Sequence, residues 1–392
     1  MSIIIAILVL GLIITVHEFG HFMMAKFFKV PVREFSIGMG PRLFSKVIKN
    51  TRYSLKAFPI GGSCAMIGED AAGSGDFSEA EDVKIDEDGN YDFDGVKFTK
   101  EEIDNNNFSV ISPIKKFFIC LAGPFMNFLL AILLSFVLVS NLGFDVPIIS
   151  GISEGGAASV AEPYSLESGD EIIGLEIPGE KESIISYRDL LLFMQLHNDE
   201  ILNNNYPLLV TFKRENEIKK TLLYPKLDSE HNRAMIGISL MDIQKKPANI
   251  IETCDFAFKE FYFYIKTTVM SLRMLIRGKL GTKDISGPVG TVAVMGSAIS
   301  EAHSISLASM LLTLATMVVL ISANLGVMNL LPIPALDGGR IVFATIEMII
   351  GKPINKNFEA VANTITMVLL LIFMVWIFGM DLYKIFSGSL IG

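Results

Sequence analysis

The stretch from Ile3 to Ala25, IIIAILVLGLIITVHEFGHFMMA, is one long apolar run with three ionisable side chains near its end. As a helix, a run of this length crosses the roughly 30 Å hydrocarbon core of a bilayer. A secretory signal peptide would carry a basic residue before the run and a small-x-small cleavage site after it, and neither is present. The stretch therefore predicts a membrane-spanning helix.

Further apolar runs indicate a four-span protein. They cover Phe117 to Leu142, Ile305 to Leu331 and Val361 to Phe378. A shorter run from Ile341 to Ile350 is too short to cross, so we expect it to re-enter or to lie at the surface. Hydrophobic residues make up 51% of the chain and charged residues 19%, and the pooling of the former into runs is typical of an α-helical integral membrane protein.

Composition also excludes other classes. The formal net charge of −9 argues against a nucleic-acid partner, since phosphate binding requires clustered lysine and arginine. The three cysteines, Cys64, Cys120 and Cys254, have no metal-binding spacing and indicate no disulfide framework.

Basic residues near the span ends set the expected orientation in the cell membrane. They cluster after the first run, before the second, and between the third and fourth: Lys26, Lys29, Arg33, Arg42, Lys46, Lys49, Arg52, Lys56, Lys115, Lys116, Arg340, Lys352 and Lys356. These sides should be cytoplasmic. The two termini and the stretch 143–304 should then be extracytoplasmic.

The segments between the spans differ in character. Residues 53–57 alternate as a strand that should end in a Gly-Gly turn. Residues 69–107 are acidic and lack the calcium-loop spacing, so we expect a solvated, partly disordered loop. Residues 250–280 predict an amphipathic helix. The expected organisation is: first span 1–28; cytoplasmic or re-entrant β region with acidic loop 29–112; second span 113–142; extracytoplasmic β-rich domain 143–240, with a helix over 186–197; amphipathic helix and linker 241–304; third span 305–340; re-entrant piece and fourth span 341–392.

The sequence HEFGH at 17–21 carries the chemistry of the first span. Positions i and i+4 share one face of a helix, so His17 and His21 can bind one metal ion while Glu18 acts on its bound water. Zinc suits two imidazoles and an oxygen ligand, and it lowers the pKa of bound water toward neutrality. Glu18 would take the water's proton and pass it to the leaving amine. Three ionisable groups inside a span are costly and normally functional.

A catalytic zinc site needs three protein ligands and one open position. Asp337, in NLLPIPALDGGR, is the candidate third ligand, because it follows two prolines that break the third apolar run. The expected orientation places it at the cytoplasmic end of that run, at the depth of His21. The rival interpretation, an ordinary aspartate turn, applies to most Asp-Gly-Gly sequences.

Asparagines within the apolar runs are a second set of candidate site residues. Asn324 and Asn329 precede the prolines, and side-chain amides in lipid demand partners. Each could hold the substrate backbone or a developing oxyanion, or simply join helices. For Asn127, in AGPFMNF, helix packing is the favoured interpretation.

These motifs together resemble the site-2 protease family of intramembrane metalloproteases, and specifically its bacterial RseP type. HEFGH, AGPFMNF and NLLPIPALDGG carry the resemblance, joined by FSIGMGP, PIGGSCAMIGED and SGPVG at 286–290. The likeness runs from residue 1 to about residue 385. It implies zinc held by His17, His21 and Asp337, with Glu18 as catalytic acid and base. It further implies that Asn324 and Asn329 contact the substrate strand.

The resemblance also implies a membrane-associated β-hairpin over 52–68 and an extracytoplasmic PDZ-like domain that gates access by size. Its GD-turn region carries Ser165-Leu166-Glu167 where Gly-Leu is usual. The implied substrates are single-span proteins, such as membrane-bound anti-sigma factors, or remnant signal peptides. The leading hypothesis is thus an intramembrane zinc endopeptidase that works within the lipid bilayer. The alternative is a non-enzymatic membrane receptor that captures peptides with a PDZ-type domain. A metal transporter would need more polar residues across several spans.

Overall fold

The structure, a computed structural model, describes residues 2–69, 84–86, 89–228, 233–240, 244–278 and 287–386. The chain forms two compact units. The first comprises Met1–Leu134 and Tyr264–Gly392, and the second comprises Ser135–Phe263. The unit boundaries fall inside two long helices, α4 (Pro113–Leu142) and α7 (Ile250–Ile276).

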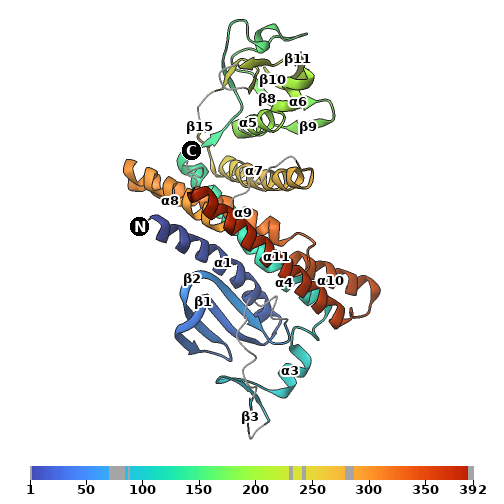
Figure 1. Ribbon diagram of the computed structural model, residues 1–392. Helices are drawn as coiled ribbons and strands as arrows, with labels where there is room; N and C mark the ends of the chain where they lie inside the picture. The colour runs from blue at the N-terminus through green and yellow to red at the C-terminus, as the bar shows by residue number, and fades with distance from the viewer. Residues whose placement is uncertain are drawn as a thin grey trace. The chain divides into compact units, whose positions relative to one another are not determined.

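The first unit contains most of the apolar helices (Figure 1). Its elements are α1 (Ser2–Phe27), β1 (Val32–Val47), β2 (Arg52–Met66), β3 (Lys84–Ile85), β4 (Tyr91–Phe93), β5 (Val96–Phe98), α3 (Lys100–Asn106), most of α4 (Pro113–Leu142), the end of α7 (Ile250–Ile276), α8 (Pro288–Ile305), α9 (Leu307–Asn329), α10 (Asp337–Ile350) and α11 (Lys356–Phe386).

Four helices of the described chain are long and apolar enough to cross a membrane: α1, α4, α9 and the Asn357–Lys384 portion of α11. The four apolar runs predicted as spans therefore lie in four candidate membrane helices. The third ends at Asn329, because Pro332 and Pro334 cannot continue a helix without losing backbone hydrogen bonds. The short apolar run forms α10, which begins at Asp337 and stops at Gly351, a residue with a left-handed φ of 70°.

Strands β1 and β2 make an antiparallel sheet that lies against α1 (Figure 1). Both strands bend, so that residues 34–37 of β1 pair with 62–65 of β2 on one side and with 52–55 on the other. The prediction that the strand ends at a Gly-Gly turn was wrong, because β2 runs through both glycines to Met66. Here glycine permits close approach: a Cβ on Gly62 would lie 2.9 Å from the Ser36 carbonyl oxygen.

The acidic region has more local order than its composition predicts. Strands β3, β4 and β5 form a small antiparallel sheet. Helix α3 starts with a capping box in which the Thr99 and Glu102 side chains each bond the other's backbone N–H. Hydrogen bonds from Lys97 and from the Asn90 backbone lower the pKa of Asp86 to about 2. Residues 70–83 and 87–88 lie outside the described residues, and with them much of the acidic stretch.

Helix α8 occupies a segment that the sequence predicts as linker. It packs on α1 and α9 around the buried side chains of Ala6, Met295 and Ile299. The N-terminus of α8 is capped by a residue distant in sequence. The buried Asp381 carboxylate of α11 accepts hydrogen bonds from the backbone N–H groups of Gly287 (3.0 Å) and Gly290 (2.8 Å). A cap supplied by another helix leaves no local signal, which explains why the helix start was missed.

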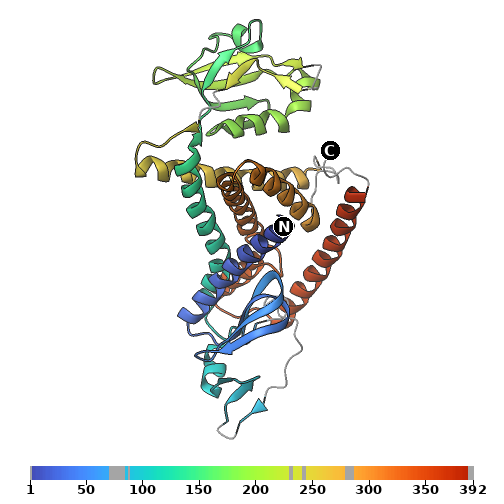
Figure 2. The same cartoon turned by 90° about the vertical axis from the view of Figure 1, so that its left-hand side faces the viewer.

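The second unit is mainly a β structure (Figure 2), and its buried apolar side chains form a core of their own. A four-stranded sheet has the order β11-β10-β8-β9, and a two-stranded sheet pairs β14 with β7. The core includes Leu175, Phe193 and Phe212, so α5 packs against the larger sheet.

The elements of the second unit are β6 (Phe144–Asp145), β7 (Ile149–Ile152), η1 (Ala157–Val160), β8 (Glu171–Ile177), β9 (Glu180–Ser183), α5 (Tyr187–Leu196), α6 (Asn198–Asn204), β10 (Leu208–Arg214), β11 (Glu217–Leu223), β12 (Lys226–Asp228), β13 (Arg233–Met235), β14 (Ile238–Leu240) and β15 (Gln244–Lys245).

Candidate metal centre

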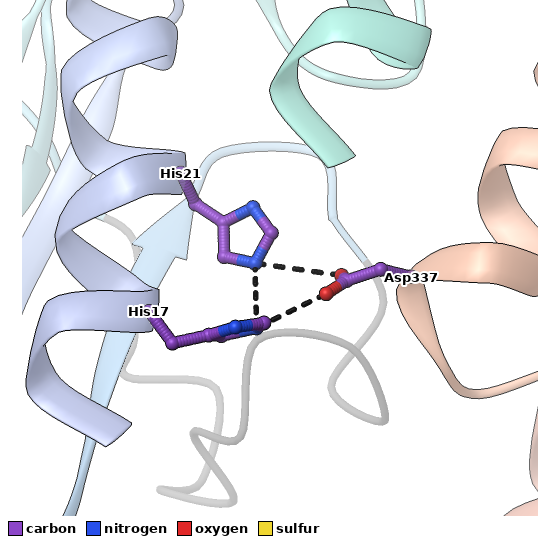
Figure 3. A group of neighbouring side chains, drawn as sticks. All are labelled: His17, His21 and Asp337. Carbon is purple, nitrogen blue, oxygen red and sulfur yellow. Dashed lines mark hydrogen bonds and ion pairs between the residues drawn. The ribbon is translucent and has the colours of Figure 1, made fainter. Parts of the chain in front are cut away.

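Three side chains predicted as metal ligands meet in the first unit, as Figure 3 shows. His17 Nε2 lies 3.0 Å from Asp337 Oδ2, and His21 Nε2 lies 3.4 Å from Asp337 Oδ1. The two Nε2 atoms are 3.1 Å apart. Both histidines are buried and Asp337 is largely so. Among the described residues, this is the one group of three or more His, Cys, Asp or Glu side chains whose ligand atoms lie close enough to hold a metal.

Two local features bring these ligands together. His17 and His21 lie one turn apart on α1 and therefore project from the same face. Asp337 is the first residue of α10, whose first turn sits close against the preceding loop. A Cβ on Gly338 would lie 2.2 Å from the Leu331 carbonyl oxygen, and one on Gly339 2.3 Å from that of Ile333. The Gly-Gly pair thus allows the first turn of α10 to pack closely against the loop that precedes Asp337.

Helix α4 forms one wall of the centre. Its Ile119 carbonyl lies 2.8 Å from His21 Nδ1, and the Asn127 amide nitrogen lies 3.2 Å from His17 Nδ1. Between them, Gly123 leaves room for both rings, because a Cβ there would lie 2.3 Å from His21 Nε2. The outer ring nitrogens of both histidines are therefore engaged, which directs the two Nε2 atoms to the centre.

The predicted substrate asparagines differ in position. Asn329, the last residue of α9, places its Nδ2 3.4 Å from His17 Nε2, beside the three ligands. Asn324 instead accepts a hydrogen bond from the Thr268 hydroxyl of α7. The structure brings Asn329 to the centre and joins Asn324 to a neighbouring helix.

Glu18 projects from α1 toward strand β2. A Cβ on Gly62 would lie 3.6 Å from Glu18 Cγ, and the carboxylate accepts a backbone hydrogen bond from Cys64. Residues 62–66 pair with β1 along one edge, and no described strand pairs with the other. The catalytic candidate thus lies beside a strand edge that pairs with no other described strand.

A buried ion pair supports α10 from behind. Arg340, one turn after Asp337, pairs with Glu69 just beyond β2, and its guanidinium stacks over the Phe108 ring. Burial raises the pKa of the Glu69 carboxyl, although the nearby Arg340 opposes that shift. The pair fastens the helix that carries Asp337 to the end of the β1–β2 sheet.

The donor set fits zinc. Two imidazole nitrogens and a carboxylate oxygen are ligands that zinc prefers, and three protein ligands leave one position open. For bonds of about 2.0–2.1 Å in tetrahedral geometry, neighbouring ligand atoms lie roughly 3.3 Å apart. The two Nε2 atoms, 3.1 Å apart, lie close to this value, and each has one Asp337 oxygen at a similar distance, Oδ2 at 3.0 Å from His17 and Oδ1 at 3.4 Å from His21.

Sequence reasoning missed Gly123, the Ile119 carbonyl and the Arg340–Glu69 pair. A glycine or a carbonyl carries no chemical signature, so contacts across helices were needed to find them. For Asn127, packing was the favoured interpretation, and the structure adds a contact with His17. The motif AGPFMNF, already noted, holds both Gly123 and Asn127.

Comparison with known proteins agrees with this picture. The family model described as Peptidase family M50 matches residues 5–373. A relative from Fusobacterium nucleatum, named as a zinc metalloprotease, is 36% identical over 99% of this chain and 100% of its own. A similarly named protein of Clostridium acetobutylicum is 34% identical over 95% of each chain. Zinc metalloprotease RasP of Geobacillus kaustophilus is 28% identical over 98% of each chain.

The family match covers most of the chain, including all three candidate ligands and the helices that hold them. The predicted enzyme class and cofactor are confirmed by the names that these relatives share. With its four apolar helices, the chain belongs to peptidase family M50, the site-2 protease family, as a multi-pass membrane zinc metalloprotease.

Proposed function

We propose that the enzyme cuts single-span membrane proteins or remnant signal peptides within the membrane. The observation that carries this proposal is the meeting of His17, His21 and Asp337 on apolar elements. The histidines lie in the candidate span α1, and Asp337 follows the end of the candidate span α9. A hydrolytic centre built on such helices acts where the hydrophobic segments of its substrates lie.

The residues of the centre take distinct roles in this proposal. His17, His21 and Asp337 hold zinc. When bound, zinc polarises water and the scissile carbonyl and lowers the pKa of the water toward neutrality. Glu18 accepts the proton of the attacking water and delivers it to the leaving amine.

The two asparagines are assigned to the substrate. Asn329 is placed to donate to the developing oxyanion, since its Nδ2 lies beside the ligands. Asn324 contacts the substrate strand by exchanging its bond with Thr268 for one to the peptide.

The substrate must be extended before it is cut. A helix hides its amides in internal hydrogen bonds, and unwinding in a membrane requires replacement partners. The edge of residues 62–66 that pairs with no described strand offers such partners next to Glu18. An unwound segment that adds to this edge as a strand would present its backbone to the centre.

The distribution of basic residues supports the topology proposed for this chain. Lysine and arginine follow α1 and precede α4, which favours a cytoplasmic location for these ends. The centre then lies near the cytoplasmic side, with both termini and the β-rich second unit outside.

The second unit supports a PDZ-like role. A groove runs between α5 and the stretch 233–239, lined by Leu190, Met194, Ile236 and Ile238 among others. An apolar groove between a helix and a strand suits an extended peptide. We propose that this unit restricts access to substrates already trimmed outside. The same groove favours the alternative function, a non-enzymatic peptide receptor.

Substitution of Glu18 distinguishes these functions. The Glu18→Gln variant should fold and retain one zinc per chain, yet lose cleavage of a co-expressed single-span substrate by about 10²–10⁴-fold. A receptor would contain no stoichiometric zinc by elemental analysis and would be indifferent to this change. Membrane fragments that accumulate in cells with Glu18→Gln, relative to wild type, would identify the substrates.

A further inference from the structure

The outer nitrogens of the two histidines face partners of different kinds. His21 Nδ1 faces the Ile119 carbonyl, which can only accept. His17 Nδ1 faces the Asn127 amide, which donates through Nδ2 or accepts through Oδ1 after a half-turn of its side chain. His21 is therefore fixed with its proton on Nδ1, whereas His17 can adopt either tautomer.

The Asn127 amide presents its nitrogen, and not its oxygen, to the His17 ring. Asn127 Nδ2 lies 3.2 Å from His17 Nδ1, an arrangement in which Nδ1 accepts. His17 Nε2 faces Asp337 Oδ2 at 3.0 Å, on the side where the candidate ligand atoms gather. Asn127 Oδ1 is buried and has no hydrogen-bond partner among the described residues. In this orientation the amide oxygen is therefore unsatisfied.

Zinc bound at His17 Nε2 would instead require His17 Nδ1 to donate a hydrogen bond. A neutral imidazole that binds metal through Nε2 keeps its proton on Nδ1, where it needs an acceptor. Asn127 Nδ2 would then meet an N–H group, and two donors cannot bond each other. A half-turn of the amide brings Oδ1 to the position now held by Nδ2 and restores the hydrogen bond.

We infer that Asn127 is a positioning residue that selects the metal-binding tautomer of His17 by presenting Oδ1 to Nδ1–H. Asn127 lies on α4 eight residues after Ile119, so one helix face orients both imidazoles. The side chain is fully buried, which makes this contact its main polar requirement. The inference rests on the proposed binding of zinc by His17.

Zinc affinity of the purified full chain tests the inference. Asn127→Asp keeps an acceptor, Asn127→Leu keeps similar volume without one, and Asn127→Ala serves if the leucine variant does not fold. Ser135→Ala is the matched control, because Ser135 is also buried on α4 with a hydroxyl that lacks a partner. Dissociation constants come from competition with a chelator in detergent, and thermal melting of the zinc-free forms reports folding.

The expected result is a loss of zinc affinity of about 10–100-fold in Asn127→Leu, the usual effect of removing an outer-shell partner. Asn127→Asp and Ser135→Ala should stay within threefold of wild type. Nitrogen-15 spectra of histidine-labelled, zinc-loaded wild type should show the His17 proton on Nδ1. Equal affinities in the aspartate and leucine variants, or a proton on Nε2, would overturn the inference. A wild-type chain that binds no zinc would instead reject the proposed function itself.

Discussion

Asp337 Oδ2 lies 3.0 Å from His17 Nε2, although the two residues stand near opposite ends of the chain. The contact joins α10 to α1 and makes the centre a product of the tertiary fold. Loss of any one ligand should therefore release zinc. His17→Gln, His21→Gln and Asp337→Asn should each weaken zinc binding by more than the roughly 10–100-fold that follows loss of an outer-shell partner. His303→Gln, at an exposed histidine, is the control. Zinc retained at one equivalent in a ligand variant would show that the residue is not a ligand.

Gly123 should tolerate no side chain. In Gly123→Ala the new Cβ would lie 2.3 Å from His21 Nε2 and 2.9 Å from His17 Cε1, so both rings would have to move. A displacement of this kind costs on the order of 100-fold in cleavage rate. Gly379→Ala in α11 is the matched control, since nothing lies within 4 Å of its new Cβ. Zinc affinity and cleavage rate should both fall in the first variant alone; equal behaviour of the two variants would contradict the packing described here.

Loss of one partner of the Arg340–Glu69 pair should lower the free energy of unfolding, mainly because it leaves the other charge buried and unpaired. Both side chains are buried, so Arg340→Met would strand the Glu69 carboxyl and should cost about 3–5 kcal/mol. The double variant Arg340→Met/Glu69→Leu should recover most of that loss, because no charge remains unpaired. Unfolding by denaturant in detergent measures the coupling. Strictly additive effects of the two substitutions would show that the pair is not coupled.

Acid should destabilise the β1–β2 sheet through Glu34. Burial alone would raise the pKa of Glu34, but the two hydrogen bonds from Arg42 (3.0 and 2.8 Å), together with the neighbouring Ser54 and Lys56, lower it below its ordinary value. A carboxyl with a lowered folded pKa stabilises the fold above its unfolded pKa, and this contribution is lost as the pH falls through the folded value. Wild type should therefore lose stability below about pH 4.3, the ordinary glutamate pKa. Glu34→Gln should lack this part of the pH dependence, and an unchanged profile would contradict the assignment.

Much of this structure follows from local sequence. The apolar runs predicted the four long helices, because spanning a bilayer leaves a signal in composition alone. The spacing of HEFGH predicted that His17 and His21 share a face, and the prolines before Asp337 marked the break after α9.

Other features depend on contacts that no local pattern records. Helix α8 takes its cap from Asp381 of α11, and β2 continues through glycines because α1 and β1 pack closely against it. The Asn324 amide joins Thr268 of α7, a pairing set by how the helices pack. In each case the decisive partner is distant in sequence.

The position of the cut in a substrate shows whether the enzyme cleaves within the membrane. The purified enzyme and a single-span substrate would be placed together in lipid vesicles, and mass spectrometry of the products would locate the new termini. We expect termini inside the apolar segment with wild type and no such products with Glu18→Gln. Cleavage confined to the soluble flanks, or cleavage within the apolar segment at the wild-type rate by Glu18→Gln, would contradict this expectation.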